Sequence, residues 1–227
     1  MRRSLLLCLL LSTFVPLLEA GSAPRGSRAS TKRGTSSRLA SQAATRASRW
    51  VGLSSLSKVS RSVNDDCSGL AALAYQPHGV RLLPEHTFPG ENGVTAIHRK
   101  ARELGTLRRW PKAGDLVFFR ETYDRNRDGE RNDGLTHIGV VERVARDGTV
   151  TFVHRGGDGV KRAKLHLLRP HLRRDAKGRV LNDYLRRPDG QTELRLAGQL
   201  VAGFASVDTR WKVRTAPPKA ARMAKRR

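Results

Sequence analysis

A cysteine, Cys67, stands in the run Asn-Asp-Asp-Cys-Ser-Gly-Leu that covers residues 64–70. The apolar stretch at 70–75 follows at once and predicts a short helix that begins at Cys67. A cysteine in the first turn of a helix faces unpaired backbone N–H groups and the positive end of the helix dipole, and both stabilise the thiolate over the thiol. The sequence therefore predicts that Cys67 is a thiol nucleophile.

A thiol nucleophile needs a base within hydrogen-bond reach, and that base needs a third group to fix its tautomer. Among seven histidines, His137 opens an apolar run at 137–144, and His154 ends a second run at 150–154. The Asp147-Gly148 pair between the runs predicts an antiparallel hairpin. Side chains on paired strands lie within about 5 Å of one another, so His137 is the candidate base and His154 its orienting partner. The alternative is that His137 caps a strand and His154 lies on the surface, without chemistry.

The segment 124–135 has the acceptor pattern of a calcium loop, with oxygen side chains at positions 1, 3, 5 and 9 and glycine at position 6. Position 12 is Leu135, so the final bidentate acid is missing, and three arginines within the segment oppose a cation. A solvated polar insertion is the alternative. The thiol chemistry requires no cofactor, so calcium would have a structural role. The candidate ligands are Asp124, Asn126, Asp128 and Asn132.

The elements that must position these side chains follow from hydrophobic periodicity and turn signals. Helices are predicted first in the chain and an antiparallel sheet after them, which makes the fold class α+β. A basic, leucine-rich stretch at 161–187 is expected to form a loop over one edge of the sheet. The predicted helices are 38–50, 67–76, 93–104 and 193–205, and the predicted strands are 116–119, 137–144, 150–154 and 160–165.

The first 20 residues have the pattern of a secretory signal peptide. Two arginines after Met1 precede an apolar stretch at 5–18, and small residues begin at Ala20. Cleavage after Ala20 removes Cys8 and leaves Cys67 as the single cysteine of a protein exported to the periplasm, the cell envelope or the exterior. An odd cysteine in such a protein favours a reactive thiol or an intermolecular disulfide.

The full sequence has a formal net charge of +24, and positive charge dominates the residues after the leader. We expect a basic low-complexity linker at 21–48, one domain at 49–208 and a basic disordered tail at 209–227. The partner would be a polyanion, with an anionic envelope polymer favoured over nucleic acid, while charge that serves only solubility is the alternative. No segment after the leader is apolar enough to span a membrane.

Four blocks in order resemble the NlpC-type cell-wall peptidases, a papain-like, bacterial and exported family. They are 66–70 (Asp-Cys-Ser-Gly-Leu), 111–119 (Pro-Lys-Ala-Gly-Asp-Leu-Val-Phe-Phe), 136–141 (Thr-His-Ile-Gly-Val-Val) and 152–154 (Phe-Val-His). The resemblance covers roughly residues 45–165 and implies a papain-like fold with the nucleophile at a helix N-terminus. The tyrosine and paired glycines that such domains carry shortly before the cysteine are absent, and the longer hairpin is similar to the related CHAP-type amidohydrolases.

The resemblance implies Cys67 as nucleophile, His137 as base and His154 as the third polar residue. The implied reaction is acyl transfer, in which an amide bond of a peptidoglycan stem peptide is cleaved through an acyl enzyme. Transfer to an amine acceptor shares that intermediate. An inert module of the same fold that binds envelope polymers, and a basic nucleic-acid-binding protein, are the alternatives from other functional classes. The bond that is cut, the source of the wall and the oligomeric state stay open.

Overall fold

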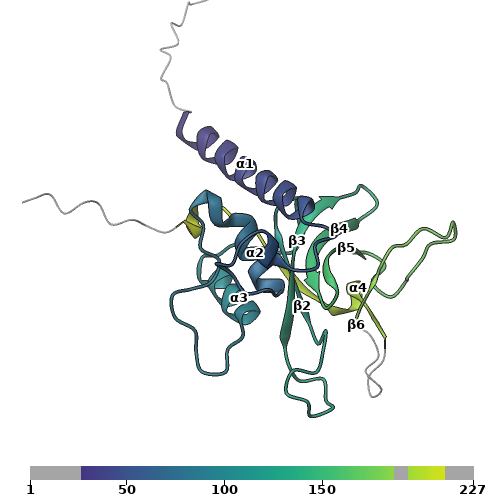
Figure 1. Ribbon diagram of the computed structural model, residues 1–227. Coiled ribbons are helices and arrows are strands. Elements are labelled where there is room, and N and C mark those ends of the chain that lie inside the picture. The colour runs from purple at the N-terminus through teal and green to yellow at the C-terminus, as the bar shows by residue number, and fades with distance from the viewer. Residues whose placement is uncertain (1–26, 187–193, 213–227) are drawn as a thin grey trace, which may run out of the picture.

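Three helices precede the sheet in the chain (Figure 1). The computed structural model describes residues 27–186 and 194–212, and in it these helices are α1 (Ser27–Arg49), α2 (Cys67–Tyr75) and α3 (Gly93–Glu103). The predicted helices at 67–76 and 93–104 are confirmed, and the one at 38–50 begins earlier, at Ser27. Short 3₁₀ helices follow at Leu56–Lys58, Gln76–His78 and Thr209–Trp211.

Six antiparallel strands form the main sheet in the order β1-β8-β2-β3-β4-β5. A group of helices followed by an antiparallel sheet confirms the α+β class. A second sheet has two strands, β6 and β7, and the four-residue helix α4 (Ala197–Leu200) follows it. The strands are β1 (Leu107–Arg108), β2 (Leu116–Arg120), β3 (Leu135–Val144), β4 (Thr149–Gly156), β5 (Gly159–His166), β6 (Tyr184–Arg186), β7 (Arg195–Leu196) and β8 (Val201–Ala205).

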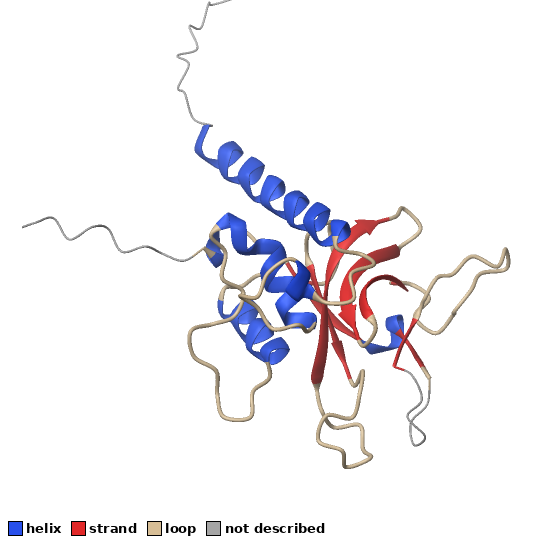
Figure 2. Ribbon diagram, viewed as in Figure 1, coloured by secondary structure: helices blue, strands red, loops and turns tan. Residues whose placement is uncertain are grey.

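Helices cover both faces of the sheet (Figure 2), and the core residues place α1, α2 and α3 on one side and α4 on the other. Alternate residues of β2 therefore pack into two cores, Leu116 and Phe118 on the α2 side and Val117 and Phe119 on the α4 side. This explains why β2 is a continuous apolar run instead of an alternating one. β3, which pairs with β2 and carries His137, also has residues in both cores and is therefore held between the two packed layers.

The C-terminal half of α1 belongs to the larger core, although residues up to 48 were expected to form a linker. Leu39, Ala43 and Ala47 are buried there beside Trp50. These residues recur every three or four positions, so one stripe of an otherwise polar and basic helix faces the domain. The packed domain thus begins near Leu39 and not at residue 49.

The predicted helix at 193–205 is wrong. Helical geometry is limited to α4, and Val201–Ala205 is the strand β8, which pairs with β1 on one side and β2 on the other. Leu196, Leu200 and Phe204 recur at a helical spacing, but the backbone of β8 gains ladder hydrogen bonds on both sides, and tertiary pairing overrides local propensity. Gly203, with φ of 151°, takes a conformation outside the helical region.

The expected signal peptide at 1–20 lies outside the described residues, as do residues 21–26 of the expected linker and 213–227 of the expected tail. Within the part of the chain that the structure describes, no helix combines the length and apolar composition needed to cross a bilayer.

Candidate active site

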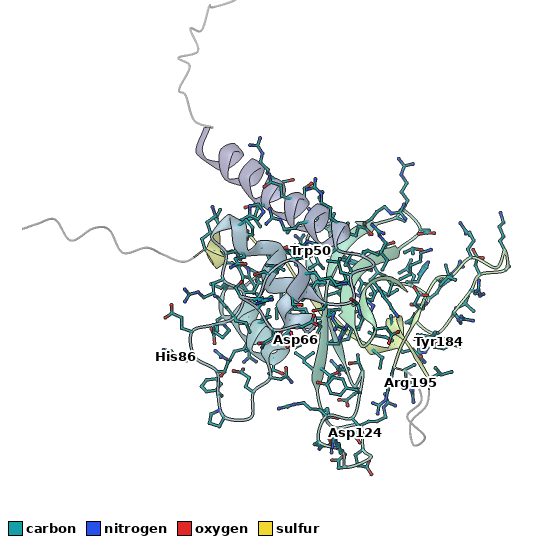
Figure 3. All side chains as sticks on the ribbon, in the orientation of Figure 1. Trp50, Asp66, His86, Asp124, Tyr184 and Arg195 are labelled. Atoms are coloured by element: carbon teal, nitrogen blue, oxygen red, sulfur yellow. The ribbon has the colours of Figure 1, made fainter. Side chains whose placement is uncertain are left out.

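Cys67 is the first residue of α2, and the residues around it explain why the helix begins there. Asp66 is the N-cap, and one of its carboxylate oxygens accepts hydrogen bonds from the backbone N–H of Gly69 and the hydroxyl of Ser68, both at 2.7 Å. A Cβ on Gly69 would lie 1.8 Å from the carbonyl oxygen of Asn64, so only glycine fits beneath the preceding loop. The Asp-Cys-Ser-Gly run is thus a helix start that fixes the cysteine, and Asp66 marks it in Figure 3.

The thiol lies where β3 and β4 separate. The ladder between these strands runs from Val144 and Val150 to Val140 and Val153 and ends there. Beyond that point Ile138 of β3 is still paired with Phe118 of β2, and Cys67 packs against the core to which Ile138 belongs. Cys67 and His137 line the same pocket there.

The two histidines, one from each strand, meet where β3 and β4 separate. Nε2 of His137 lies 2.9 Å from Nδ1 of His154, and the ring centroids are 5.0 Å apart at an interplanar angle of 82°. Both imidazoles are buried, and with Cys67 they line one pocket of about 490 Å³. The structure therefore brings together the three residues that the sequence singled out, and since Nε2 of His137 is bonded, its Nδ1 is the nitrogen left for a proton transfer.

Burial controls the protonation of all three groups. It raises the pKa of the Cys67 thiol to about 11, although the N–H groups of Ile138, Ser68 and Cys67 itself act in the opposite direction. Burial and the neighbouring His154 hold the pKa of His137 well below its usual range, and burial lowers the pKa of His154 to about 4. The expected thiolate is thus not the form of the free protein near pH 7, because desolvation outweighs the helix N-terminus.

No protein-family model, curated protein or solved structure matches this chain.

The pocket is larger than the space around Cys67 and the two histidines. It continues into a second hollow of about 710 Å³ behind His154. Two residues between the hollows, Tyr123 and Leu185, supply apolar surface, and Tyr123 is 49 % exposed. The residues that line both hollows are Thr122, Tyr123, His154, Gly156, Gly157 and Leu185.

Sequence reasoning missed several residues at this site. Thr122 and Tyr123 follow β2, just before the segment whose pattern predicts a calcium loop. Asn92 caps α3 at the rim of the pocket. Asp65 and Arg155 also line the pocket, and they form an ion pair. Their positions within two residues of Cys67 and His154 are the only signal in the sequence, since nothing in the sequence pairs them.

In the loop proposed for calcium, the carboxylate oxygens already accept hydrogen bonds from other groups of the same loop. The carboxylate of Asp124 accepts hydrogen bonds from the backbone N–H groups of Arg127 and Gly129, and one oxygen of Asp128 accepts from the amides of Asn126 and Asn132, both at 2.7 Å. Within residues 27–186 and 194–212, no group of three His, Cys, Asp or Glu side chains converges as metal ligands. An ion here would depend on the two asparagine oxygens, and both amides would have to turn away from Asp128.

We expect this loop to take up calcium weakly, with a Kd of about 10⁻³ M, because it offers two carboxylates and lacks the closing bidentate acid. Calorimetric titration with calcium at millimolar concentration measures this, and Asp128→Ala should remove the heat. A wild-type protein that gives no heat at millimolar calcium would leave the polar insertion as the correct interpretation.

Proposed function

We propose that this protein is an exported papain-like cysteine hydrolase that cleaves amide bonds in peptidoglycan stem peptides. The observation that carries the proposal is the juxtaposition of Cys67, at the start of α2, with the hydrogen-bonded pair His137 and His154 in one pocket. A helix-borne thiol beside two histidines from an antiparallel sheet is the arrangement that nucleophilic acyl transfer requires. The substrate class rests on the sequence resemblance, whose blocks supply all three side chains.

The protonation states favour a general-base mechanism. With His154 neutral, its Nδ1 accepts the Nε2–H of His137, which leaves a lone pair on Nδ1 of His137. That nitrogen takes the thiol proton as the sulfur of Cys67 attacks the amide carbonyl carbon. Creating the thiolate and the imidazolium together is favourable compared with either charge alone, because opposite charges attract strongly at short range.

The remaining steps conserve atoms and protons. The sulfur–carbon bond forms, the carbon–nitrogen bond breaks, and the imidazolium of His137 gives its proton to the leaving amine. A water then attacks the thioester, His137 accepts the proton of this water, and the carboxylic acid product leaves with Cys67 again a thiol. Backbone N–H groups at the start of α2 are the expected donors to the oxyanion, and one such donor contributes about 100- to 1000-fold.

The partners and location follow the same proposal. The basic segments on either side of the packed domain, before Leu39 and after Trp211, would hold the enzyme to an anionic envelope polymer, and the leader would direct it out of the cytoplasm. Binding of nucleic acid by these segments is the weaker option, because aromatic side chains that stack on bases are sparse in them.

A second candidate function is an inert envelope-binding module of the same fold. The observation that favours it is the buried thiol, whose pKa of about 11 is that of an unreactive cysteine. Alkylation by iodoacetamide at pH 7 separates the two functions. An enzyme with His137 in place reacts measurably faster than a free thiol of the same pKa, whereas an inert module does not.

Digestion of purified peptidoglycan sacculi tests the proposed function. Wild-type protein without its leader and the Cys67→Ala variant are incubated with sacculi, and released fragments are identified by mass spectrometry. Stem-peptide fragments from the wild type alone support the hydrolase and identify the bond. Absence of fragments from both, with a folded protein and an unreactive thiol, supports the binding module.

The pH profile of kcat/KM should have a broad plateau. Activity requires neutral His137, whose pKa is lowered, so the rate falls only when the pH drops well below 6.5. The alkaline limit should lie near the thiol pKa of about 11, because the neutral pair persists up to that point. Rates measured between pH 4 and 11 check this, and an alkaline limb at about pH 8–9 would instead indicate a resting thiolate–imidazolium pair.

Substitution of His154 should be milder than loss of the base. His154→Ala removes the acceptor that orients the ring of His137, whereas His154→Asn keeps an acceptor oxygen on the same strand. We expect kcat to fall about 10- to 1000-fold in the alanine variant and less in the asparagine variant. A kcat of His154→Ala equal to that of the wild type would remove His154 from the mechanism.

A further inference from the structure

An ion pair joins the loop before Cys67 to the strand that ends at the second histidine. Nε of Arg155 lies 3.0 Å from Oδ1 of Asp65, and Nη2 lies 3.1 Å from Oδ2, so the guanidinium binds the carboxylate at two points. Asp65 is two residues before Cys67, and Arg155 directly follows His154. The pair therefore connects the two segments whose separation sets the distance between sulfur and imidazole.

Each partner is also fixed by further contacts. Oδ1 of Asp65 accepts the backbone N–H of Leu56 at 2.8 Å, and Nη1 of Arg155 donates to the carbonyl oxygens of Gly156 and Gly157. The side chain of Arg155 is only 14 % exposed, so it is held between these groups and is not a solvated surface arginine. A planar guanidinium with three kinds of partner leaves little freedom to either segment.

The backbone around the site explains why such a connection is needed. β4 pairs with β5 along its whole length, as far as Gly156 and Gly159, but its ladder with β3 ends at Val153. No backbone ladder therefore holds the end of β4, which carries His154, to β3. The Asp65–Arg155 pair holds this end of β4 to the loop before α2 instead.

We propose that Asp65 and Arg155 are positioning residues, which join the loop before α2 to the end of β4 and hold Cys67 at the working distance from the His137–His154 pair. The inference rests on the proposed function for its catalytic consequence, since misplacement of a reacting group by about 1 Å costs roughly 100-fold in rate. Neither residue touches the reacting atoms, so their effect is exerted through Cys67 and His154.

A double-mutant cycle tests the proposal. Asp65→Asn, Arg155→Gln and the double variant are compared for kcat and KM on sacculi fragments. We expect each single variant to lose about 10- to 100-fold in kcat with KM nearly unchanged, and the double variant to be no worse than either. A single change that leaves kcat intact, or losses that multiply in the double variant, would overturn the proposal.

Glu142→Gln is the matched control, because Glu142 also binds an arginine at two points, Arg162, at 2.8 and 2.9 Å. That pair joins β3 and β5 and does not line the pocket of Cys67. The control should keep the wild-type kcat, while its melting temperature should change by about as much as in the Asp65 and Arg155 variants. An equal loss of kcat in the control would show a general effect of removing an ion pair and would contradict the positioning role.

Alkylation of Cys67 by iodoacetamide at pH 7 provides a readout that needs no peptidoglycan. The rate should fall in both single variants and in the double variant, and stay unchanged in Glu142→Gln, because His137 assists the thiol only at the correct distance. This pattern in a protein that releases no stem peptides would refute the peptidoglycan substrate and support the positioning pair. If Arg155→Gln does not fold, Arg155→Lys, which keeps the charge but not the two-point contact, should give an intermediate rate; a wild-type rate would contradict the proposal.

Discussion

Replacement of Cys67 by alanine is expected to abolish amide hydrolysis, a loss of roughly 10⁴-fold or more in kcat. The sulfur atom is the group that forms the bond to the substrate carbonyl, and alanine leaves nothing that can replace it. The side chain is partly buried at the edge of the larger core, so its removal should cost little stability. Fragment release from sacculi measures the rate, and thermal unfolding verifies the fold.

Cys67→Ser is the informative companion. Serine approximately preserves the size of the side chain, but its hydroxyl is far less acidic than a thiol. We expect a folded protein that binds sacculi and hydrolyses them at a small fraction of the wild-type rate. Full activity of Cys67→Ala would end the nucleophile assignment, whatever the serine variant does.

Replacement of His137 by alanine should be nearly as severe, about 10³- to 10⁴-fold in kcat. Without the imidazole, the buried thiol keeps its proton at neutral pH because its pKa is about 11, and no group protonates the leaving amine. The substitution also leaves a ring-sized space beside His154, so added imidazole should restore part of the rate. Single-turnover release of the amine product measures both effects.

His166→Ala is the control for the loss of a buried imidazole. His166 is 3 % exposed on β5, and its Nδ1 accepts the backbone N–H of Leu168, outside the pocket of Cys67. This variant should lose stability without losing kcat per folded molecule, and it should not respond to imidazole. A wild-type kcat in His137→Ala would exclude this residue as the base.

Local signals in the sequence were sufficient for the elements that carry the candidate site. The Asp-Cys-Ser-Gly run encodes a cap, a helix start and a close approach at Gly69, and the structure has the helix at these residues. The Asp147-Gly148 pair fixed the hairpin between β3 and β4, which brings His137 and His154 to 2.9 Å. Patterns that act within about ten residues are the ones a single sequence records.

The properties that the sequence did not predict depend on distant partners. The residues of β8 by themselves predict a helix, because the pairing of this strand with β1 and β2 depends on residues outside its own segment. The helix N-terminus, a local feature, predicts a low pKa for Cys67, whereas burial of the thiol against the larger core depends on residues far away in the sequence. The Asp65–Arg155 pair joins residues 90 positions apart, and no periodic pattern in the sequence predicts such a contact.

The place of β8 has a consequence for how the molecule acquires its shape. The last strand of the sheet to be synthesised is inserted between β1 and β2, so the sheet stays split into two parts until Ala205 has left the ribosome. Pairing of Leu107 with Ala205 closes a long loop, which makes the final step of folding slow compared with hairpin formation. The edge of β2 is exposed during that interval and is open to pairing with other chains. Assembly of the candidate site, which includes Thr122 and Tyr123 just after β2, is therefore tied to synthesis of the chain as far as Ala205.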